Sequence, residues 1–331
     1  MTGPLLSVVF SFRNEVDVLA ELVRRMRQVL GGEVARGTLG GWELIFVDDA
    51  STDGSAALLR EVALGHDDIR IVTMSRPFGN SQCVMAGLER ARGDLVVYMD
   101  ADLQDPPELI PTMIDAMRAR ADVEVVHTVR TARDGETRLK LLITKLGYRI
   151  LRTVSTVDLL IEAGDFKLLS RRAVGHLLTL RERKPFLRGL VAWIGFGYAV
   201  VPYRRAARFG GQTKFNVISR SVIRNFLESA LISFSDVPLQ LASAFGILVS
   251  MAAFAFSAYL GVITLAGRAA PAWWWAIAFT MFLGGLQLLG IGILGLYLNA
   301  VFLESKNRPP YIVARTFGFS EEREPAGAPL P

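Results

Sequence analysis

The stretch Leu95-Val-Val-Tyr-Met-Asp-Ala-Asp-Leu-Gln-Asp-Pro-Pro-Glu108 places acidic residues directly after a short apolar run. The apolar part, Leu95–Met99, predicts a β-strand, and side chains two positions apart on an extended chain point the same way. Asp100, Asp102 and Gln104 are therefore expected to direct oxygen atoms toward one point beyond the strand. Two bare carboxylates about 4 Å apart repel by roughly 4 kcal/mol at an effective dielectric constant near 20. Because Mg²⁺ or Mn²⁺ removes that repulsion, the stretch predicts a divalent metal site; the alternative is a solvated acidic turn that caps a helix.

The residues Asp105-Pro-Pro-Glu108 have the composition of a helix start, with a capping aspartate, a proline in the first turn and an early acidic residue. Short apolar strands alternate with amphipathic helices throughout residues 1–130. This alternation predicts an α/β fold with a mostly parallel sheet and helices on both faces. The expected strands are 5–10, 43–47, 69–74, 95–99 and 122–126, and the expected helices are 16–30, 51–64, 81–91 and 107–118.

Two more polar clusters follow strands of this predicted sheet. Asp48 and Asp49 come after the strand 43–47, and Arg13 and Asn14 come after the strand 5–10. In open α/β sheets, ligands bind beyond the carboxyl ends of the strands. Three polar clusters at three strand ends therefore predict a nucleotide pocket. The cluster at Asp48 and Asp49 is also compatible with a plain turn that caps a helix.

Long charge-free runs dominate the C-terminal third of the chain. No Asp, Glu, Lys or Arg lies between Asp236 and Arg268, or between Arg268 and Glu304. Each run exceeds the roughly 20 residues that a helix needs to cross a bilayer. We expect one crossing within 237–265 and another within 273–303; the alternative is a buried helical hairpin. Basic residues flank both crossings, which predicts a multi-pass protein of the inner (plasma) membrane with both termini cytoplasmic.

Composition narrows the protein class further. The chain has 331 residues, 51% of them hydrophobic, and a formal net charge of +5, which suits the face of an anionic membrane. The single cysteine, Cys83, excludes an internal disulfide and fits a reducing compartment. The N-terminus lacks the pattern of a secretory signal. Neither zinc-type spacing nor aromatic–basic interleaving is present, so no nucleic-acid partner is expected.

The chain resembles family 2 glycosyltransferases, and within them the polyprenyl-phosphate glycosyltransferase group. The resemblance extends over residues 5–315. It rests on the acidic stretches already quoted, on the paired C-terminal crossings and on several further motifs taken together. These motifs are Val47-Asp-Asp-Ala-Ser-Thr-Asp-Gly-Ser55, Ser75-Arg-Pro-Phe-Gly79, Gly164-Asp-Phe-Lys-Leu-Leu-Ser-Arg171, Arg188-Gly-Leu-Val-Ala-Trp-Ile-Gly195 and Arg208-Phe-Gly-Gly-Gln-Thr-Lys-Phe215.

The resemblance implies a GT-A fold, a UDP- or GDP-linked sugar donor, Mg²⁺ or Mn²⁺ and a polyprenyl phosphate acceptor. It also implies roles for individual residues on the donor side. Asp49 is expected at the nucleotide base, with Asn14 and Asp48 beside the nucleotide, Asp100 near the ribose and metal, and Asp102 with Gln104 on the metal. Arg130 and Arg208 fall where relatives bind phosphate, and Lys214 is a weaker candidate. Relatives usually carry a Pro-aromatic pair where this chain has Phe12-Arg13.

The implied reaction is an inverting transfer that needs no general base, because a phosphate monoester acceptor is already anionic near pH 7. Bound metal would take up charge on the leaving diphosphate, and arginines would orient the attacking phosphate. The three histidines, His66, His127 and His176, are expected to be surface or packing residues. Asp165 is expected either at the donor sugar or in an ion pair with Lys167 or Arg171. If the acceptor were a hydroxyl, Asp165 would be the candidate base.

These expectations give a domain plan. Residues 1–218 form the catalytic domain, including a basic amphipathic segment at about 139–154 that is expected either on the membrane surface or packed on the core. A juxtamembrane helix at 219–235, two crossings within 236–303 and a tail at 304–331 follow. Glycines 284–295 permit close helix packing and so a homo-oligomer. The competing interpretations are a processive polysaccharide synthase, a transferase that acts on a lipid hydroxyl, and a catalytically inactive membrane scaffold.

Overall fold

The computed structural model describes residues 3–132, 163–180, 182–183, 185–204 and 272–319. These residues belong to two compact units. Residues up to 204 and those from 309 onward belong to the first unit, and residues 272–308 belong to the second. Several sequence predictions lie outside the described residues. They are the crossing within 237–265, the segments 139–154 and 219–235, and the side chains Arg208 and Lys214.

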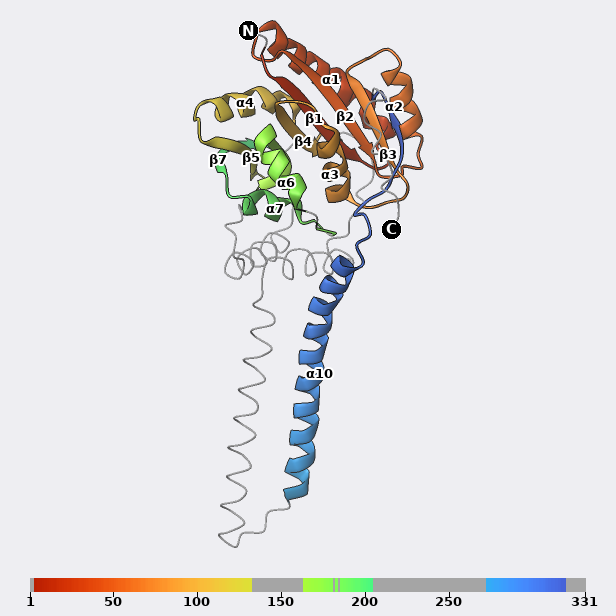
Figure 1. The fold of residues 1–331 in the computed structure, drawn as a ribbon, viewed down its shortest axis with the longest axis vertical. Coiled ribbons are helices and arrows are strands. Elements are labelled where there is room, and N and C mark those ends of the chain that lie inside the picture. Colours follow the sequence, from red (N-terminus) through yellow and green to blue (C-terminus); the bar gives the residue numbers. More distant parts are fainter. Residues whose placement is uncertain (1–2, 133–162, 181, 184, 205–271, 320–331) are drawn as a thin grey trace. The chain divides into compact units, whose positions relative to one another are not determined.

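The first unit is built on an eight-stranded sheet with the strand order β7-β5-β6-β4-β1-β2-β3-β8 (Figure 1). Strands β1 to β4 are mutually parallel where they pair, and β7 is parallel to β5, whereas β6 and β8 run antiparallel to their neighbours. The α/β fold is confirmed, and the sheet is mixed. The strands are β1 (Leu5–Phe12), β2 (Gly41–Asp48), β3 (Ile69–Met74), β4 (Leu95–Asp100), β5 (Val123–Ala132), β6 (Ala163–Ser170), β7 (Gly197–Arg204) and β8 (Val313–Phe317).

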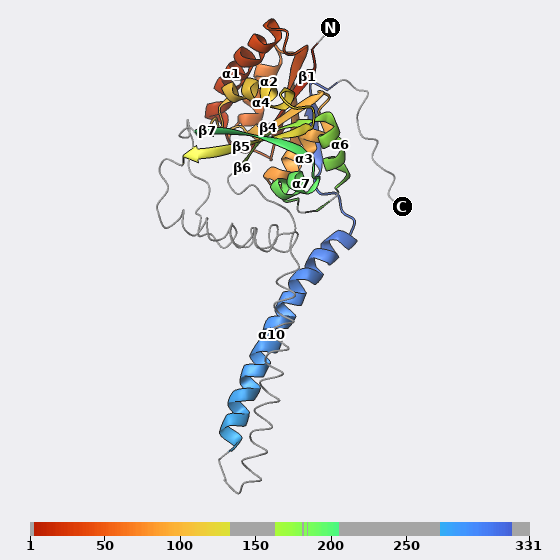
Figure 2. The same ribbon diagram turned by 90° about the vertical axis from the view of Figure 1, so that its left-hand side faces the viewer.

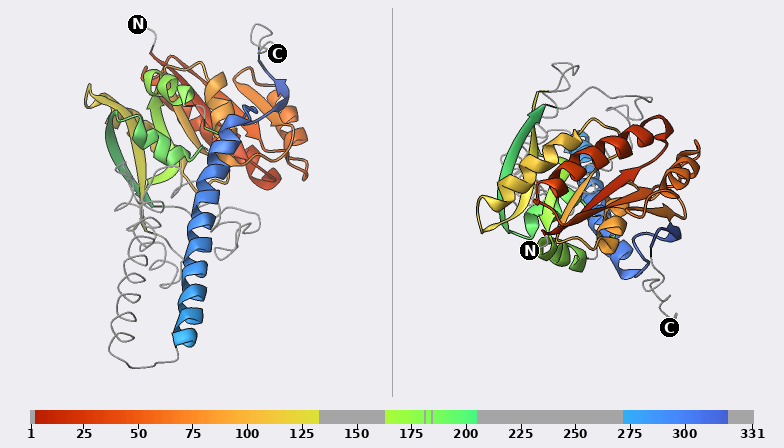
Figure 3. Two further views of the ribbon diagram at one scale, coloured as in Figure 1. Left: turned by 60° about the horizontal axis from the view of Figure 1, so that its bottom comes forward. Right: turned by 90° about the horizontal axis from the view of Figure 1, so that it is seen from above.

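Helices cover both faces of this sheet, as the view from above shows (Figure 3). They are α1 (Val16–Ala35), α2 (Ser55–Ala63), α3 (Asn80–Arg90), α4 (Ile110–Arg118), α6 (Arg171–Thr179) and α7 (Leu187–Trp193), and a short 3₁₀ turn, η1 (Pro107–Leu109), precedes α4. Helix α3 approaches the strands closely at Gly87, where a β-carbon would run into the side chains of Val9 and Val47. The predicted helices are confirmed, with ends shifted by a few residues.

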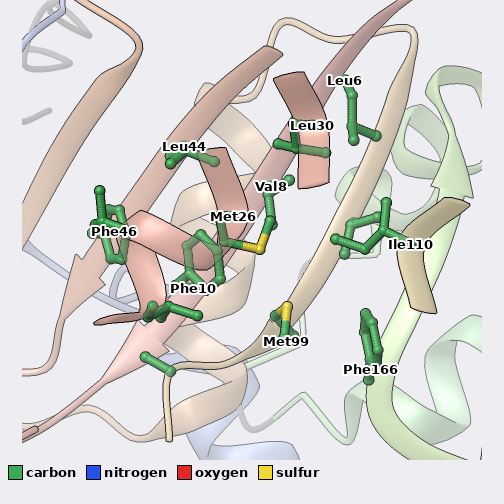
Figure 4. Close-up of a cluster of buried hydrophobic side chains, with 14 of the residues drawn as sticks. Leu6, Val8, Phe10, Met26, Leu30, Leu44, Phe46, Met99, Ile110 and Phe166 are labelled. Carbon is green, nitrogen blue, oxygen red and sulfur yellow. The ribbon is translucent and has the colours of Figure 1, made fainter. Parts of the chain in front are cut away.

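The largest core cluster lies between the sheet and the α1–α4 side of the unit. Phe10 of β1 and Phe46 of β2 stack with ring centroids 4.6 Å apart, and Met26 of α1 packs near them (Figure 4). Ile110 of α4 and Phe166 of β6 extend the cluster toward the next strands. Burial of each such side chain stabilises the fold by about 1.5–3 kcal/mol. This rigid core fixes the strand ends that carry the polar clusters.

The C-terminal segment returns to the first unit, which the sequence did not predict. Strand β8 pairs antiparallel with β3 at the edge of the sheet. The two residues just before β8 also contact the first unit. The Ile312 carbonyl accepts a hydrogen bond from the Ser75 amide at 3.0 Å, and the Tyr311 hydroxyl donates to the carboxylate of Glu89. Part of the predicted tail 304–331 is therefore an ordered strand of the catalytic sheet.

The second unit contains α10 (Ala272–Ser305), a continuous helix of 34 residues (Figure 2). Among the described residues, no helix combines the length and the apolar character that crossing a membrane requires. The predicted crossing within 273–303 therefore stays a prediction.

Candidate active site

The carboxyl ends of three adjacent strands meet at one edge of the sheet. Register pairs Phe12 of β1 with Asp48 of β2, and Ser11 of β1 with Asp100 of β4. The polar clusters that follow these strands are therefore brought together, as the sequence predicts. The carboxyl end of β5, with Arg130, lies at the same edge because β5 belongs to the same sheet and is antiparallel to β6 as β4 is.

Left-handed backbone marks each of the three strand ends. Asn14, Ala50 and Leu103 have φ values of 56°, 54° and 56°. A residue other than glycine in this region costs about 1–3 kcal/mol and is held there by its surroundings. Two hydrogen bonds hold Asn14 in place. Its main-chain amide donates to Ser51 Oγ at 2.9 Å, and its side-chain Oδ1 accepts from the Thr52 main-chain amide at 2.8 Å. Asn14 thus fastens the end of β1 to the loop after β2.

Asp48 and Asp49 each hold a neighbouring loop. Asp48 is buried, which raises its pKa, and it accepts a hydrogen bond from the Ser51 amide at 2.9 Å. Asp49 accepts from the amides of Phe78 and Gly79 at 2.6 and 3.1 Å. The two carboxylates therefore shape the loops that would enclose a nucleotide.

The acidic pair after β4 is held by short-range and long-range contacts. Asn80, the first residue of α3, donates from Nδ2 to Asp100 at 3.1 Å, and its Oδ1 accepts from the Ser11 hydroxyl. Asp102 accepts from the Gln104 amide at 3.1 Å and is 9% exposed. Asn80 is not among the site residues predicted from the sequence; the signal for it is its position directly after Gly79, at a helix start that follows a strand.

The oxygen-bearing side chains after β4 have the composition of a metal site that substrate and water complete. Within the described ranges, no group of three or more His, Cys, Asp and Glu side chains is arranged to hold a metal ion. A cage made of protein side chains alone is thus not seen there. Mg²⁺ and Mn²⁺ commonly take one or two carboxylates and complete their shell with substrate phosphates and water. Asp100, Asp102 and Gln104 supply oxygens suited to that arrangement.

Asp105 does not cap the following helix, so that part of the prediction is wrong. Pro106 occupies the capping position of η1, and no side chain caps it. Asp105 is fully buried instead, where it accepts a hydrogen bond from the Tyr203 hydroxyl and lies 3.8 Å from Arg130 Nη2. Arg130 Nε also donates to Tyr203 Oη at 3.1 Å. A buried carboxylate needs such partners because it is costly to desolvate alone, and this requirement outweighs local capping.

Asp165 forms a bidentate ion pair with Arg188 of α7. The Nε–Oδ1 and Nη2–Oδ2 distances are 2.7 and 2.6 Å. The predicted pairing with Lys167 or Arg171 is wrong, because Arg171 donates to the carbonyls of Ala91 and Gly93, and Lys167 donates to the carbonyl of Gly164. Although burial alone would raise the pKa of Asp165, the charge and hydrogen bonds of Arg188 lower it to about 2. A carboxylate with so low a pKa is a poor general base near neutral pH.

Comparison with known proteins identifies the family. Residues 7–178 match the sequence model of glycosyl transferase family 2. The chain belongs to glycosyl transferase family 2. An uncharacterised glycosyltransferase of Bacillus subtilis shares 36% identity with this family 2 chain over 96% of the chain and 95% of the relative. A prophage-derived bactoprenol glucosyl transferase of Shigella flexneri shares 33% identity over 93% of the chain and 96% of the relative.

Among solved structures, glucosyl-3-phosphoglycerate synthase from Mycobacterium tuberculosis, in complex with Mn²⁺, UDP-glucose and phosphoglyceric acid, is similar to this chain at 23% identity. The match covers 68% of this chain and 79% of that chain, with a TM-score of 0.46. A likeness of this size does not bear on function.

Proposed function

We propose that this family 2 glycosyltransferase moves a sugar from a nucleotide-sugar to polyprenyl phosphate. The observation that carries the proposal is the similarity to a bactoprenol glucosyl transferase along 93% of the chain and 96% of the relative. A similarity confined to residues 7–178 would indicate only the transferase family. The regions that follow the catalytic motifs are shared as well, and these are the regions expected to meet a lipid acceptor.

In this proposal the residues at the strand ends bind the nucleotide-sugar donor. Asp49, with the loop that it fastens at Phe78 and Gly79, is proposed to face the nucleotide base. Asp100 and Asp102 would hold Mg²⁺ or Mn²⁺, which when bound neutralises charge on the diphosphate. Asn80 donates a hydrogen bond to the Asp100 carboxylate and would help to orient it for this role.

The state of Asp165 favours an anionic acceptor over a hydroxyl. A hydroxyl acceptor requires a base, and Arg188 holds the pKa of Asp165 at about 2, so that carboxylate binds protons weakly. A phosphate acceptor needs no such base, since it is ionised near pH 7. Direct attack by the phosphate on the anomeric carbon, from the side opposite the leaving diphosphate, would invert that centre. Arg130 and Arg208 are the proposed phosphate-binding residues.

The membrane placement is proposed from the sequence. The charge-free runs 237–267 and 269–303 are each long enough for a helical crossing. Basic residues outside them favour a cytoplasmic catalytic unit. In that arrangement the lipid-linked phosphate and the water-soluble donor would meet at the cytoplasmic face of the inner membrane.

The proposal is tested with the purified full-length protein in detergent. The protein is incubated with a panel of UDP- and GDP-sugars, a short-chain polyprenyl phosphate and Mg²⁺ or Mn²⁺. Mass spectrometry of the organic phase is expected to show one polyprenyl-phospho-sugar, with its signal lost after treatment with a chelator and restored by added metal. Product formed equally well by chelated protein would remove the metal from the proposal.

Two controls test the proposed acceptor and the proposed metal site separately. A polyprenol without phosphate should remain unmodified, and a glycosylated polyprenol would instead favour a hydroxyl acceptor. Asp102→Asn removes one charge at the proposed metal site and is expected to abolish transfer while the protein stays folded. If no nucleotide-sugar yields a lipid product with the native protein, the proposed function is wrong.

A further inference from the structure

Lys167 is a charged side chain buried inside the sheet. It lies on β6 with 1% of its surface exposed, and the strand register places it beside Tyr98 of β4 and His127 of β5. Its ammonium donates a hydrogen bond to the main-chain carbonyl of Gly164 at 2.5 Å. Burying an ammonium group is unfavourable unless it is well paired and hydrogen-bonded. The hydrogen bond that Lys167 makes therefore decides what this residue does in the fold.

The Gly164 carbonyl belongs to the peptide group that leads into Asp165. Lys167 therefore holds this peptide group at its carbonyl oxygen, while Arg188 holds the Asp165 side chain at 2.7 and 2.6 Å. Gly164 itself is confined, because a β-carbon there would approach Arg130 Nη2 to 3.0 Å. The backbone that carries Asp165 is thus fixed from several directions.

The register shows which end of the sheet Asp165 occupies. Tyr98 pairs with Lys167 in an antiparallel ladder, so moving from Lys167 to Asp165 on β6 corresponds to moving from Tyr98 toward Asp100 on β4. Asp165 and Lys167 are two residues apart and point to the same face of β6. The Asp165–Arg188 pair consequently lies at the sheet edge where the acidic residues after β4 gather.

We infer that Lys167 is a positioning residue for the transfer reaction: its hydrogen bond to Gly164 fixes the backbone that presents the Asp165–Arg188 pair to the donor. Because Lys167 is buried, it is not assigned a contact with the reacting atoms. The inference rests on the proposed function, because it assigns the sheet edge to a nucleotide-sugar.

The charges around Lys167 support this role and give it a pH signature. Asp165 and Asp105 are the anionic groups that act on it, Arg188 and Arg130 are the cationic ones, and Tyr98 and His127 flank it. Burial lowers the pKa of Lys167 to about 7, against the opposing effect of Asp165. Burial and the charge of Lys167 lower the pKa of His127 to about 3, so this ring is neutral near pH 7. Lys167 is therefore expected to lose its positive charge near neutral pH.

The test compares Lys167→Met with Leu169→Met, which lies two residues farther along β6 and is also buried. Lys167→Met removes the hydrogen bond and the charge, whereas Leu169→Met conserves volume and apolar character. At about pH 6 we expect Lys167→Met to lower kcat roughly tenfold or more, with KM for the nucleotide-sugar little changed, because misplaced groups mainly affect the transition state. Its melting temperature is measured alongside, because the variant removes a buried charge but also leaves the Gly164 carbonyl without this donor.

The pH profile separates positioning from a merely structural role. The ratio of native to Lys167→Met turnover should be largest near pH 6 and shrink toward about pH 8.5, where the lysine is mostly neutral and its amine donates only a weaker, uncharged hydrogen bond to Gly164. Should Lys167→Met fail to fold, Lys167→Arg replaces it; this variant keeps its charge at every pH and should flatten the profile. Native-like turnover of folded Lys167→Met, a ratio that does not change with pH, or an Arg variant with the native profile would overturn the inference.

Failure of the proposed function gives a different pattern. In that case the native protein and Leu169→Met also leave polyprenyl phosphate unmodified. Hydrolysis of the nucleotide-sugar in the absence of acceptor, measured on the same samples, still depends on the Asp165–Arg188 geometry. A loss of hydrolysis in Lys167→Met alone supports the inference, and equal hydrolysis in all three proteins overturns it.

Discussion

Asn80 shows how a single residue connects elements that are far apart in the sequence. Its amide bridges Ser11 at the end of β1 and Asp100 at the end of β4. The amide suits this position because it accepts on one side and donates on the other. The hydrogen bond from Asn80 would help to orient the Asp100 carboxylate in the proposed metal site.

Asn80→Ala tests this bridge. The variant removes the donor to Asp100, and we expect the metal concentration for half-maximal transfer to rise, with kcat roughly tenfold lower. Stability should fall by only about 1 kcal/mol, the usual net contribution of one hydrogen bond. Initial rates measured against Mg²⁺ or Mn²⁺ concentration decide the question. Gln28→Ala, an exposed amide on α1, is the control. An unchanged metal dependence in Asn80→Ala would contradict the orienting role.

The Asp165–Arg188 pair carries a pH-dependent contribution to stability. The native pKa of Asp165, about 2, lies below the unfolded value near 4. A carboxyl with a lowered native pKa stabilises the fold above its unfolded pKa, and this contribution disappears as the pH falls toward the native pKa.

Arg188→Met should therefore lower the free energy of unfolding by about 2 kcal/mol near pH 7. The difference from the native protein should narrow as the pH falls from about 4 toward 3. Thermal unfolding across this range measures it. Arg172→Met is the matched control, because Arg172 is exposed and its ion pair with Glu124 is expected to contribute little. A destabilisation that is constant with pH would show that packing, and not the charge of Arg188, is responsible.

At the scale of elements, β8 is the part of the fold that a local pattern does not reveal. Its five residues complete the sheet beside β3, and Gly318 ends the strand with φ at 80°. A β-carbon at Gly318 would come within 2.5 Å of the Ile69 carbonyl oxygen. The close approach of the two strands at this point therefore requires glycine.

Gly318→Ala is expected to destabilise the protein through both strain and collision. Gly37→Ala is a matched control, since Gly37 has φ at 72° but nothing within 4 Å of its added β-carbon. Gly318→Ala should cost about 1–3 kcal/mol more than Gly37→Ala, because only the first variant forces the backbone of β8 away from β3. Melting temperatures of the two variants under identical conditions measure the difference. Equal shifts would mean that the β8–β3 contact adds nothing to stability.

At the scale of the whole molecule, the proposed function requires the chain to combine a water-soluble donor with a lipid acceptor. In the proposed function the described strand ends would bind the donor, and the acceptor would be bound by Arg130 of β5 together with residues outside the described ranges. Arg208 is the strongest candidate there, because the family resemblance places a phosphate-binding arginine at this position and the guanidinium matches phosphate geometry.

Arg208→Ala should raise KM for polyprenyl phosphate by roughly tenfold or more, and leave binding of the nucleotide-sugar nearly unchanged. Steady-state kinetics with each substrate varied in turn test this expectation. Arg120→Ala, which removes an exposed arginine paired with Asp122 at the protein surface, is the control. Equal losses for both substrates would assign Arg208 to a general structural role.

The sequence by itself determined the order of strands and helices in the first 130 residues and the acidic clusters that follow the strands. These features depend on hydrophobic periodicity and chain direction, which are local properties. Parallel pairing then brings the ends of β1, β2 and β4 to one edge, so the meeting of Asn14, Asp48 and Asp100 could also be predicted. The role of an acidic cluster follows from its place in such a sheet.

Only the tertiary structure decided which partner each buried charge has. Asp105 lies 98 positions from Tyr203, and Asp165 lies 23 positions from Arg188. No periodicity in the sequence encodes such pairs, because the choice among several nearby arginines, lysines and hydroxyls is made by how the strands and helices pack. The cost of leaving a desolvated charge unpaired then selects the arrangement that the folded chain adopts.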